Sequence, residues 1–336
     1  MILSLLVGIS IIAALFWFVD MTEVWVIMRR VSPSWLVASF IASGVAYIII
    51  GLKWKIIVMP IRPVSLRTLT SLSVLSNFGT TLIGMRVEEL LRPLLLRAKE
   101  QVPFATGLSS IFIDRLLDLL VILGLASVAL VLFPENLASS GLIISALEVV
   151  AIVSFTALLL LFLAAWREKQ VLTIVNGVVS WVPLVGVRLR GQVKYLVEGA
   201  KTMGSNPRLA LAALLTLALW SIRLINYYFY FGAVGVTVPF QVVILGGAIH
   251  TLSTALPATP ARLGTHEIFW TVAFVALGLD SNQALSAALL HHIFGLVFLT
   301  VFALASATLL NLSLKEVLSP SKASQPNEQS ILPERT

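Results

Sequence analysis

Runs of about 20 apolar residues recur along the chain, and this is the length that an α-helix needs to cross a bilayer. The predicted spanning helices are residues 2–19, 35–52, 104–133, 142–166, 209–231 and 282–310. Charged residues make up 12% of the 336 residues and hydrophobic residues 58%, whereas about a quarter of the residues of a soluble domain are charged. The sequence therefore predicts an all-α polytopic membrane protein and excludes an ordinary soluble one.

Two further apolar stretches, residues 66–98 and 240–279, are interrupted by residues that break helices. The interruptions fall at Asn77, Gly79 and Gly84 in the first stretch and at Pro257, Pro260 and Gly264 in the second. Broken helices occur at membrane depth only where they are buried in protein or line a wet cavity. We therefore expect two re-entrant helical hairpins in addition to six spanning helices.

Basic residues in the loops predict the orientation of the chain. They gather in residues 53–67, 97–99 and 167–208 and are absent from residues 134–141, 232–239 and 278–281. Because loops rich in Lys and Arg stay in the cytoplasm, both termini are expected to be cytoplasmic, in a multi-pass protein of the plasma (inner) membrane. The net charge of +7 follows from this topology, so nucleic acid is not an expected partner. Arg29 and Arg30, on the opposite side, do not fit.

The two hairpins predict an inverted repeat, because one enters from the cytoplasm and the other from outside. The first repeat covers about residues 66–133 and the second about residues 240–311. Glu89 precedes Asp114 by the same 25 residues by which Glu267 precedes His292. At about 1.5 Å per helical residue, Asp114 and His292 are expected near the middle of the bilayer. Inverted repeats whose broken helices meet at the midplane are typical of secondary transporters.

A single transmembrane domain is expected over residues 1–318. Between the repeats, residues 167–207 carry apolar residues at helical spacing among basic ones, which predicts an amphipathic helix on the cytoplasmic surface. Within that linker, residues 171–187 are long enough for a marginal span, an alternative that would reverse the second repeat. Residues 319–336 are polar and lack periodicity, so we expect a disordered tail.

Ionisable residues inside apolar segments are costly in a membrane and usually mark a site. Guanidinium groups are bidentate ligands for phosphate, and helices that begin near residues 86 and 265 would present N-terminal ends that also favour anions. The carboxylates would balance these charges or bind a cationic headgroup moiety such as an amine. We therefore expect a phosphate-bearing lipid headgroup to cross a central cavity while its acyl or prenyl tails stay in lipid. The candidate substrate-binding residues are Arg86, Glu88, Glu89, Arg92, Asp114, Arg115, Asp118, Arg262, Glu267, His291 and His292.

These residues could instead have a structural role, and the sequence leaves the substrate-binding and the structural interpretation open. The carboxylates and arginines could form an ion-pair network that only holds helices together. His291 and His292 could relay protons or only pack, and since adjacent helical residues point in different directions, at most one is expected to reach the cavity. With no Cys and four His scattered along the sequence, neither a metal site nor a cofactor is expected.

Three motifs resemble those of a known family: RVEELLRP at residues 86–93, DRLLD at 114–118 and PATPARLGTHE at 257–267. They are similar to motifs of the flippase-like transmembrane family related to the membrane domain of lysylphosphatidylglycerol synthase. The resemblance covers nearly the whole chain and implies a lipid-translocating unit, here without the synthase domain. Where a pair of Gly is common in the last motif of the family, this chain has Ala261 and Arg262.

Three classes of function remain. The first is a flippase or transporter of a membrane lipid, which would be an anionic or aminoacylated phospholipid or a prenyl phosphate. The second is a membrane enzyme that acts on a lipid or polyprenyl phosphate, although the sequence has no recognisable nucleophile, metal motif or nucleotide-binding loop, so a catalytic role is less expected than transport. The third is a non-transporting partner subunit of a lipid-modifying system. A homo-oligomer is compatible with all three.

Overall fold

The computed structural model describes residues 10, 19–59, 62–83, 88–132, 152, 206–254 and 259–313, and within these ranges every regular element is a helix. The prediction of an all-α protein is confirmed. The helices, in chain order, are α2 (Met21–Arg29), α3 (Pro33–Val58), α4 (Leu66–Ile83), α5 (Glu88–Glu100), α6 (Phe104–Leu132), α10 (Asn206–Ala233), α11 (Phe240–Ser253), the 3-10 turn η2 (Pro260–Arg262), α12 (Thr265–Val275) and α13 (Ser281–Leu309).

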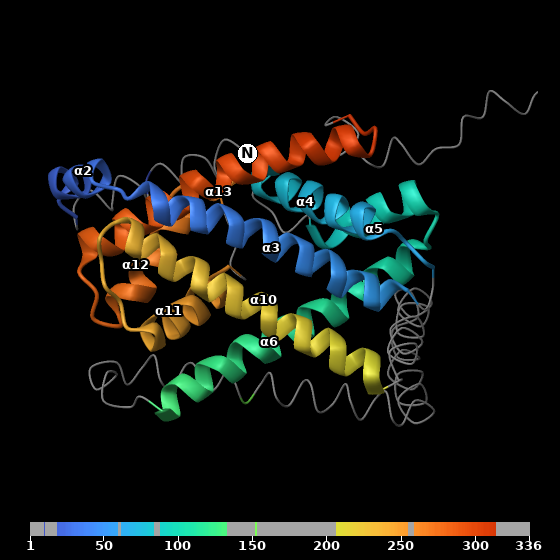
Figure 1. Cartoon of the computed structure of the whole chain (residues 1–336), viewed down its shortest axis with the longest axis horizontal. Coiled ribbons are helices and arrows are strands. Elements are labelled where there is room, and N and C mark those ends of the chain that lie inside the picture. The colour runs from blue at the N-terminus through green and yellow to red at the C-terminus, as the bar shows by residue number, and fades with distance from the viewer. Residues whose placement is uncertain are drawn as a thin grey trace, which may run out of the picture.

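Among the described residues, three helices are long and apolar enough to cross a membrane: α3, α10 and α13. They coincide with three of the predicted spans, and α3 lies along α10 (Figure 1). A fourth predicted span forms the 29-residue helix α6, which carries three charged residues in its first half. The predicted spans 2–19 and 142–166 lie almost wholly outside the described residues, as do the linker 167–207 and the tail 319–336. The count of six spans therefore stays a prediction.

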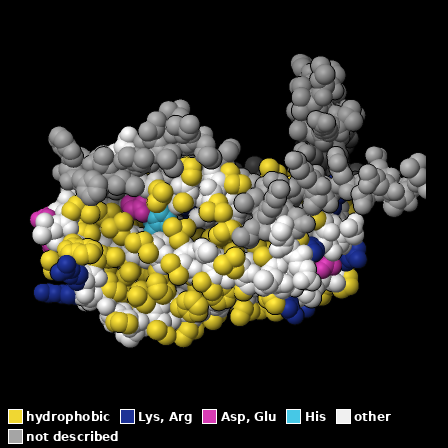
Figure 2. All heavy atoms as spheres, turned by 90° about the horizontal axis from the view of Figure 1, so that it is seen from above, with side chains coloured by type: hydrophobic (Ala, Val, Ile, Leu, Met, Phe, Trp, Pro, Cys, Tyr) yellow, Lys and Arg dark blue, Asp and Glu magenta, His cyan; other side chains and the backbone are white. Residues whose placement is uncertain are grey.

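The exterior of the bundle is suited to lipid. Large apolar side chains stay exposed on all three spanning helices, for example Ile41 at 60%, Leu214 at 61% and Val297 at 55%. Figure 2 shows hydrophobic side chains over the middle of the molecule, with Lys and Arg gathered at its two ends. Since exposed apolar surface of this extent is unfavourable in water and favourable in hydrocarbon, the fold is that of a membrane protein.

The first apolar stretch differs from the prediction, because α4 continues without interruption through Asn77 and Gly79. The Asn77 amide donates a hydrogen bond to the Tyr47 hydroxyl of α3 at 2.6 Å, so its polar group has a partner within the bundle and need not break the helix. Hydroxyls of Ser73 and Ser76 donate to carbonyls one turn earlier in the same helix. The predicted breaks at Asn77 and Gly79 are wrong, and Gly84 lies outside the described residues.

The second apolar stretch is interrupted as predicted at Pro260 and Gly264, and Pro257 lies outside the described residues. Helix α11 ends at Ser253, η2 begins at Pro260, and α12 starts at Thr265. The backbone of Ala261 has φ 52°, that of Arg262 φ 56° and that of Gly264 φ 77°, a left-handed conformation that residues other than Gly adopt rarely. The turn therefore needs contacts from its surroundings to hold it.

Two helix pairs, α4–α5 (the first hairpin) and α11–α12 (the second hairpin), occupy different ends of the bundle. Figure 1 places α4 and α5 toward one end and α11 and α12 toward the other, with α3, α10 and α13 running between them. Each end has its own apolar core: one around Trp54, Leu72 and Leu75, the other around Phe231, Trp270 and Phe274. Polar groups pack against both cores: Arg92 lies 4.9 Å from the Trp54 ring centroid, and the His291 ring lies 4.9 Å from the Trp270 ring.

Close packing within the second hairpin gives a test of the fold. A Cβ atom added at Gly246 in α11 would lie 2.4 Å from the Phe274 ring of α12, whereas one added at Gly44 in α3 would meet nothing within 4 Å. We expect Gly246→Ala to lower the free energy of unfolding by about 1–3 kcal/mol through overpacking. Gly44→Ala is the matched control and should be neutral or stabilising. Thermal unfolding in detergent measures both, and equal stabilities of the two variants would contradict the packing described.

Candidate functional site

A cavity of about 570 Å³ lies inside the bundle, and every described helix other than α2 contributes to its wall. Part of the wall is apolar, including Leu119, Ile122 and Leu296. The remainder is polar, with amide and hydroxyl groups of α3, α4 and α10. The charged and titratable residues of the wall are Tyr47, Glu89, Arg115, Asp118, Arg223, Tyr227, Arg262, His250, His266, His291 and His292. The cavity thus combines an apolar wall with a concentration of cationic groups.

Lys53 is the centre of a buried ion network beside the cavity. Its Nζ lies 2.7 Å from Asp114 Oδ1 and 2.7 Å from Asp118 Oδ1, and its side chain is only 1% exposed. The sequence prediction placed Lys53 in a cytoplasmic loop, because the apolar span was ended at Leu52. That placement is wrong: α3 continues for six further residues to Val58, which brings Lys53 opposite the acidic face of α6.

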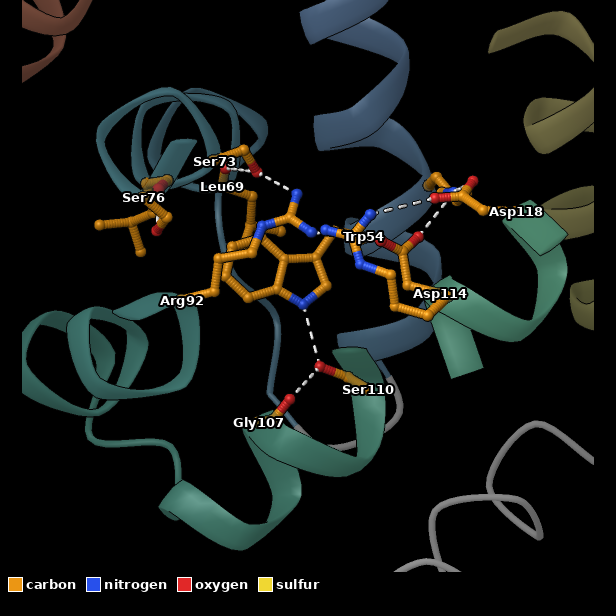
Figure 3. A network of polar contacts seen from close by, with 12 residues as sticks. Trp54, Leu69, Ser73, Ser76, Arg92, Gly107, Ser110, Asp114 and Asp118 are labelled. Atoms are coloured by element: carbon orange, nitrogen blue, oxygen red, sulfur yellow. Dashed lines mark hydrogen bonds and ion pairs between the residues drawn. The ribbon is translucent and has the colours of Figure 1, made fainter. Parts of the chain in front are cut away.

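Arg92 extends this network to the first hairpin. Its Nη1 lies 3.2 Å from Asp114 Oδ2, and its Nη2 donates to the Ser73 hydroxyl at 2.8 Å. The guanidinium also lies 4.9 Å from the centroid of the Trp54 ring, a cation–π contact. Figure 3 shows Arg92 reaching between Ser73, Trp54 and Asp114. Helices α3, α4, α5 and α6 are therefore joined through one set of charges.

Arg115 connects the network to the cavity. Its Nη1 lies 3.6 Å from Asp118 Oδ2 across one turn of α6, and its side chain remains 37% exposed, facing the cavity. Lys53, Arg92 and Arg115 contribute three positive charges against the two carboxylates of Asp114 and Asp118. Asp118 is therefore shared between the buried Lys53 and Arg115, which faces the cavity.

The second half supplies a different pair, Glu267 with His292. Glu267 Oε1 lies 2.5 Å from His292 Nδ1, and Glu267 Oε2 accepts the Gly264 N–H at 2.8 Å. The second ring nitrogen of His292, Nε2, lies 2.7 Å from the carbonyl oxygen of Ala261. Both side chains are buried. The pair consequently holds the left-handed turn η2 against α13.

All four histidines of the chain converge beside this pair, although the sequence scatters them. His291 Nδ1 lies 3.1 Å from His266 Nε2, and the His266 ring lies 4.9 Å from the His250 ring and 4.9 Å from the His292 ring. Both His291 and His292 line the cavity, so the expectation that at most one would reach it is wrong. The α11–α12 hairpin wraps α13 closely enough to meet both. No group of three His, Asp or Glu within the described ranges is arranged to hold a metal.

The predicted site residues fall into four groups. Arg92 and Asp114 belong to the buried network, and Glu267 lies behind the cavity wall. Arg86 lies outside the described residues, and Glu88 begins α5 with its side chain outside them. The predicted residues that line the cavity are Glu89, Arg115, Asp118, Arg262, His291 and His292.

Sequence reasoning missed two participants. His266 follows directly after the break at Gly264 and was not considered, and Lys53 was assigned to a loop. Arg223 and His250 also line the cavity. The available signal for Lys53 was the apolar sequence that continues after it, with Trp54, Ile57 and Val58 all buried.

By its fold and its site, this protein is an α-helical membrane protein with a cavity rich in Arg and His. Residues 1–303 match the family model described as "Lysylphosphatidylglycerol synthase TM region", so the chain belongs to that family. The resemblance seen in the motifs is confirmed. No solved structure matches the chain.

Two curated relatives are similar over nearly the whole chain. It is 24% identical to a UPF0104 membrane protein of Methanothermobacter thermautotrophicus, over 91% of this chain and 92% of that protein. It is also 24% identical to glycosyltransferase AglD of Haloferax volcanii, over 98% of this chain. The chain spans 57% of the length of glycosyltransferase AglD. The first of these relatives is thus a protein of similar extent, and the second is longer.

The buried network predicts a large effect of removing Lys53. Lys53→Met should lower the free energy of unfolding by about 3–5 kcal/mol, because it leaves two buried carboxylates short of a cation. Lys55→Met, two residues further along the same helix and only half-buried, is the control and should change stability by less than about 1 kcal/mol. Denaturation in detergent checks both variants. A Lys53→Met protein as stable as Lys55→Met would rule out the network as a stabilising feature.

Proposed function

We propose that this protein moves a phosphate-bearing lipid headgroup between membrane leaflets through the central cavity. The observation that carries the proposal is the joint presence of Arg115, Arg223 and Arg262 in the wall of one cavity within a lipid-facing bundle. Guanidinium groups bind phosphate by paired, charge-assisted hydrogen bonds. The apolar portion of the wall suits the part of the lipid next to the headgroup, whose tails remain in the bilayer.

The charges of the cavity favour an anion. Three arginines line it against two carboxylates, and one of those, Asp118, is already bound to Lys53. Arg223 stacks 5.0 Å from the Trp220 ring centroid, and none of the carboxylates that the structure describes forms an ion pair with it. A volume of about 570 Å³ lies within the range of about 300–1,000 Å³ that small-molecule sites occupy. An anionic headgroup would therefore gain charge complementarity in a space large enough for it.

The packing of the helices supports an inverted repeat. Helix α5 packs on α6 as α12 packs on α13, and α4 packs on α5 as α11 packs on α12. The contacts between the halves correspond as well, since α6 packs on α11 and α13 on α4. Exchanging α4, α5 and α6 with α11, α12 and α13 therefore preserves these contacts. Two re-entrant hairpins at opposite ends of the bundle would allow the cavity to open to each side in turn, as in secondary transporters.

The name of one relative favours a second candidate. Glycosyltransferase AglD is named for transfer of a sugar, and this chain matches 57% of its length. A cavity for a lipid phosphate would also suit a membrane unit that acts on, or presents, a prenyl phosphate to a lipid-modifying system. The two candidates differ in outcome, because only the transporter moves the headgroup across the bilayer.

Lipid exchange between leaflets tests the transport function. We expect purified protein in liposomes to accelerate exchange of a labelled anionic or aminoacylated phospholipid, and Arg223→Gln to reduce the rate at least about tenfold by removing a charge that binds phosphate, the loss expected for about 1.4 kcal/mol. Arg208→Gln, the same substitution at an exposed position of the same helix α10, should leave the rate unchanged.

Equal rates for Arg223→Gln and Arg208→Gln would contradict the assignment of Arg223 to the site. Absence of exchange with every phospholipid, together with protein-dependent binding of a prenyl phosphate, would favour the second candidate over transport.

The orientation is also part of the proposal. The loops that join α3 to α4 and α5 to α6 should face the cytoplasm, and the loop that joins α10 to α11 should face outside. The chain has no Cys, so Ser65→Cys and Thr237→Cys, both at exposed loop positions, each introduce one thiol. A membrane-impermeant thiol reagent should label Thr237→Cys in intact cells and Ser65→Cys only after permeabilisation. The reverse pattern would invert the topology.

A further inference from the structure

The contacts of His292 fix how many protons the Glu267–His292 pair must hold. The carbonyl oxygen of Ala261 can only accept a hydrogen bond, so the His292 Nε2 that lies 2.7 Å from it must carry a hydrogen. The 2.5 Å contact between Nδ1 and Glu267 Oε1 also needs a hydrogen. That hydrogen makes either an imidazolium facing a carboxylate or a neutral imidazole facing a protonated carboxyl. Either way, the pair holds one proton more than a neutral imidazole and a carboxylate.

Loss of this proton must break one of the two contacts. A neutral imidazole has a single N–H, so His292 could then donate to Ala261 or to Glu267 but not to both. The contact left without a hydrogen would place two lone pairs against each other in a buried site, which is unfavourable. The number of protons on the pair therefore decides whether His292 can keep both contacts, including the one with Ala261 of η2.

The turn that responds to this loss carries a cavity residue. Ala261 and Arg262 are both in the left-handed conformation, and the Arg262 side chain lines the cavity. The N–H of Gly264, two residues later, is held by the same Glu267 carboxylate. A change in the pair therefore acts on both sides of Arg262.

We propose that Glu267 and His292 form a proton-binding site whose occupancy sets the position of η2 and of Arg262, and so couples movement of the lipid headgroup to protons. The proton comes from water in the cavity and returns to it. The coupling to lipid rests on the proposed transport function, whereas the proton site itself does not.

Every element packed around the pair contributes to its electrostatic surroundings. Helix α4 packs on η2 and has one titratable residue, Arg67, in its first turn. Glu89, Arg115 and Asp118 line the same cavity from α5 and α6. The groups around the pair are His266 of α12, His291 of α13 and Arg262 of η2, with His250 of α11 beside His266 and with Arg223 and Tyr227 of α10 elsewhere in the cavity wall. The histidines among them offer a route for the proton into the cavity.

A fluorescent probe on the turn tests the proton site without transport. Leu263, at the end of η2, is 42% exposed, and Leu263→Cys gives the chain one thiol for a probe whose own emission does not depend on pH. We expect one transition in the probe signal as the pH is varied, because loss of the shared proton releases one of the two contacts of His292. In Glu267→Gln the transition should be lost and the signal fixed at its acid value. The Gln amide can donate to His292 Nδ1 and accept from Gly264 without a proton to lose.

Glu100→Gln, a carboxylate at the end of α5, is the matched control and should keep the wild-type curve. A wild-type signal that does not change with pH, or an unchanged transition in Glu267→Gln, would overturn the proposal. His292→Gln gives a second test that does not depend on the folding of Glu267→Gln, and its transition should also be lost.

Lipid exchange in liposomes with a pH gradient then separates the two proposals. We expect the exchange rate to depend on the gradient in the wild type and not in Glu267→Gln. Exchange that proceeds at the same rate with and without a gradient would overturn the coupling and leave lipid transport in place. A probe that titrates in a protein that exchanges no lipid would support the proton site and contradict lipid transport.

Discussion

The buried ion network around Lys53 is the interaction on which the rest of the bundle depends. Charges removed from water are stable only when partners and hydrogen bonds replace the lost hydration, and here α3, α4, α5 and α6 each contribute a group. Asp114 is held between Lys53 and Arg92, which fixes the rotation of α6. With α6 in that rotation, the next residue, Arg115, faces the cavity. The position of the cationic wall therefore follows from contacts that lie behind it.

The two halves of the bundle use similar packing for different chemistry. The first half places an ion network behind the wall, in which Lys53 contacts Asp114 and Asp118, and Arg92 contacts Asp114. The second half places a carboxylate against an imidazole and gathers the remaining histidines around it. The ion network stabilises one arrangement, whereas the proposed proton site on Glu267 and His292 would have two. This difference makes the second half the natural location for a moving part.

The sequence was sufficient for the helical class, for the spans that became α3, α10 and α13, and for the interruption at Pro260 and Gly264, since these depend on local apolar runs and helix-breaking residues. It was insufficient where a distant partner decides the outcome. Lys53 ends an apolar run by hydropathy alone, yet carboxylates more than 60 residues later in the sequence allow it to be buried. Asn77 stays inside a helix because Tyr47 accepts its amide. The convergence of the histidines depends on how α11 and α12 wrap α13, which no spacing in the sequence reveals.

The most direct test of a phosphate-binding cavity is the position of a lipid phosphorus atom in an experimental structure of the protein in anionic lipid nanodiscs. The proposed function predicts headgroup density inside the cavity, with its phosphate within hydrogen-bond distance of the Arg115, Arg223 or Arg262 guanidinium. A cavity that contains only water or acyl chains, with all phosphates at the bilayer surface, would contradict it.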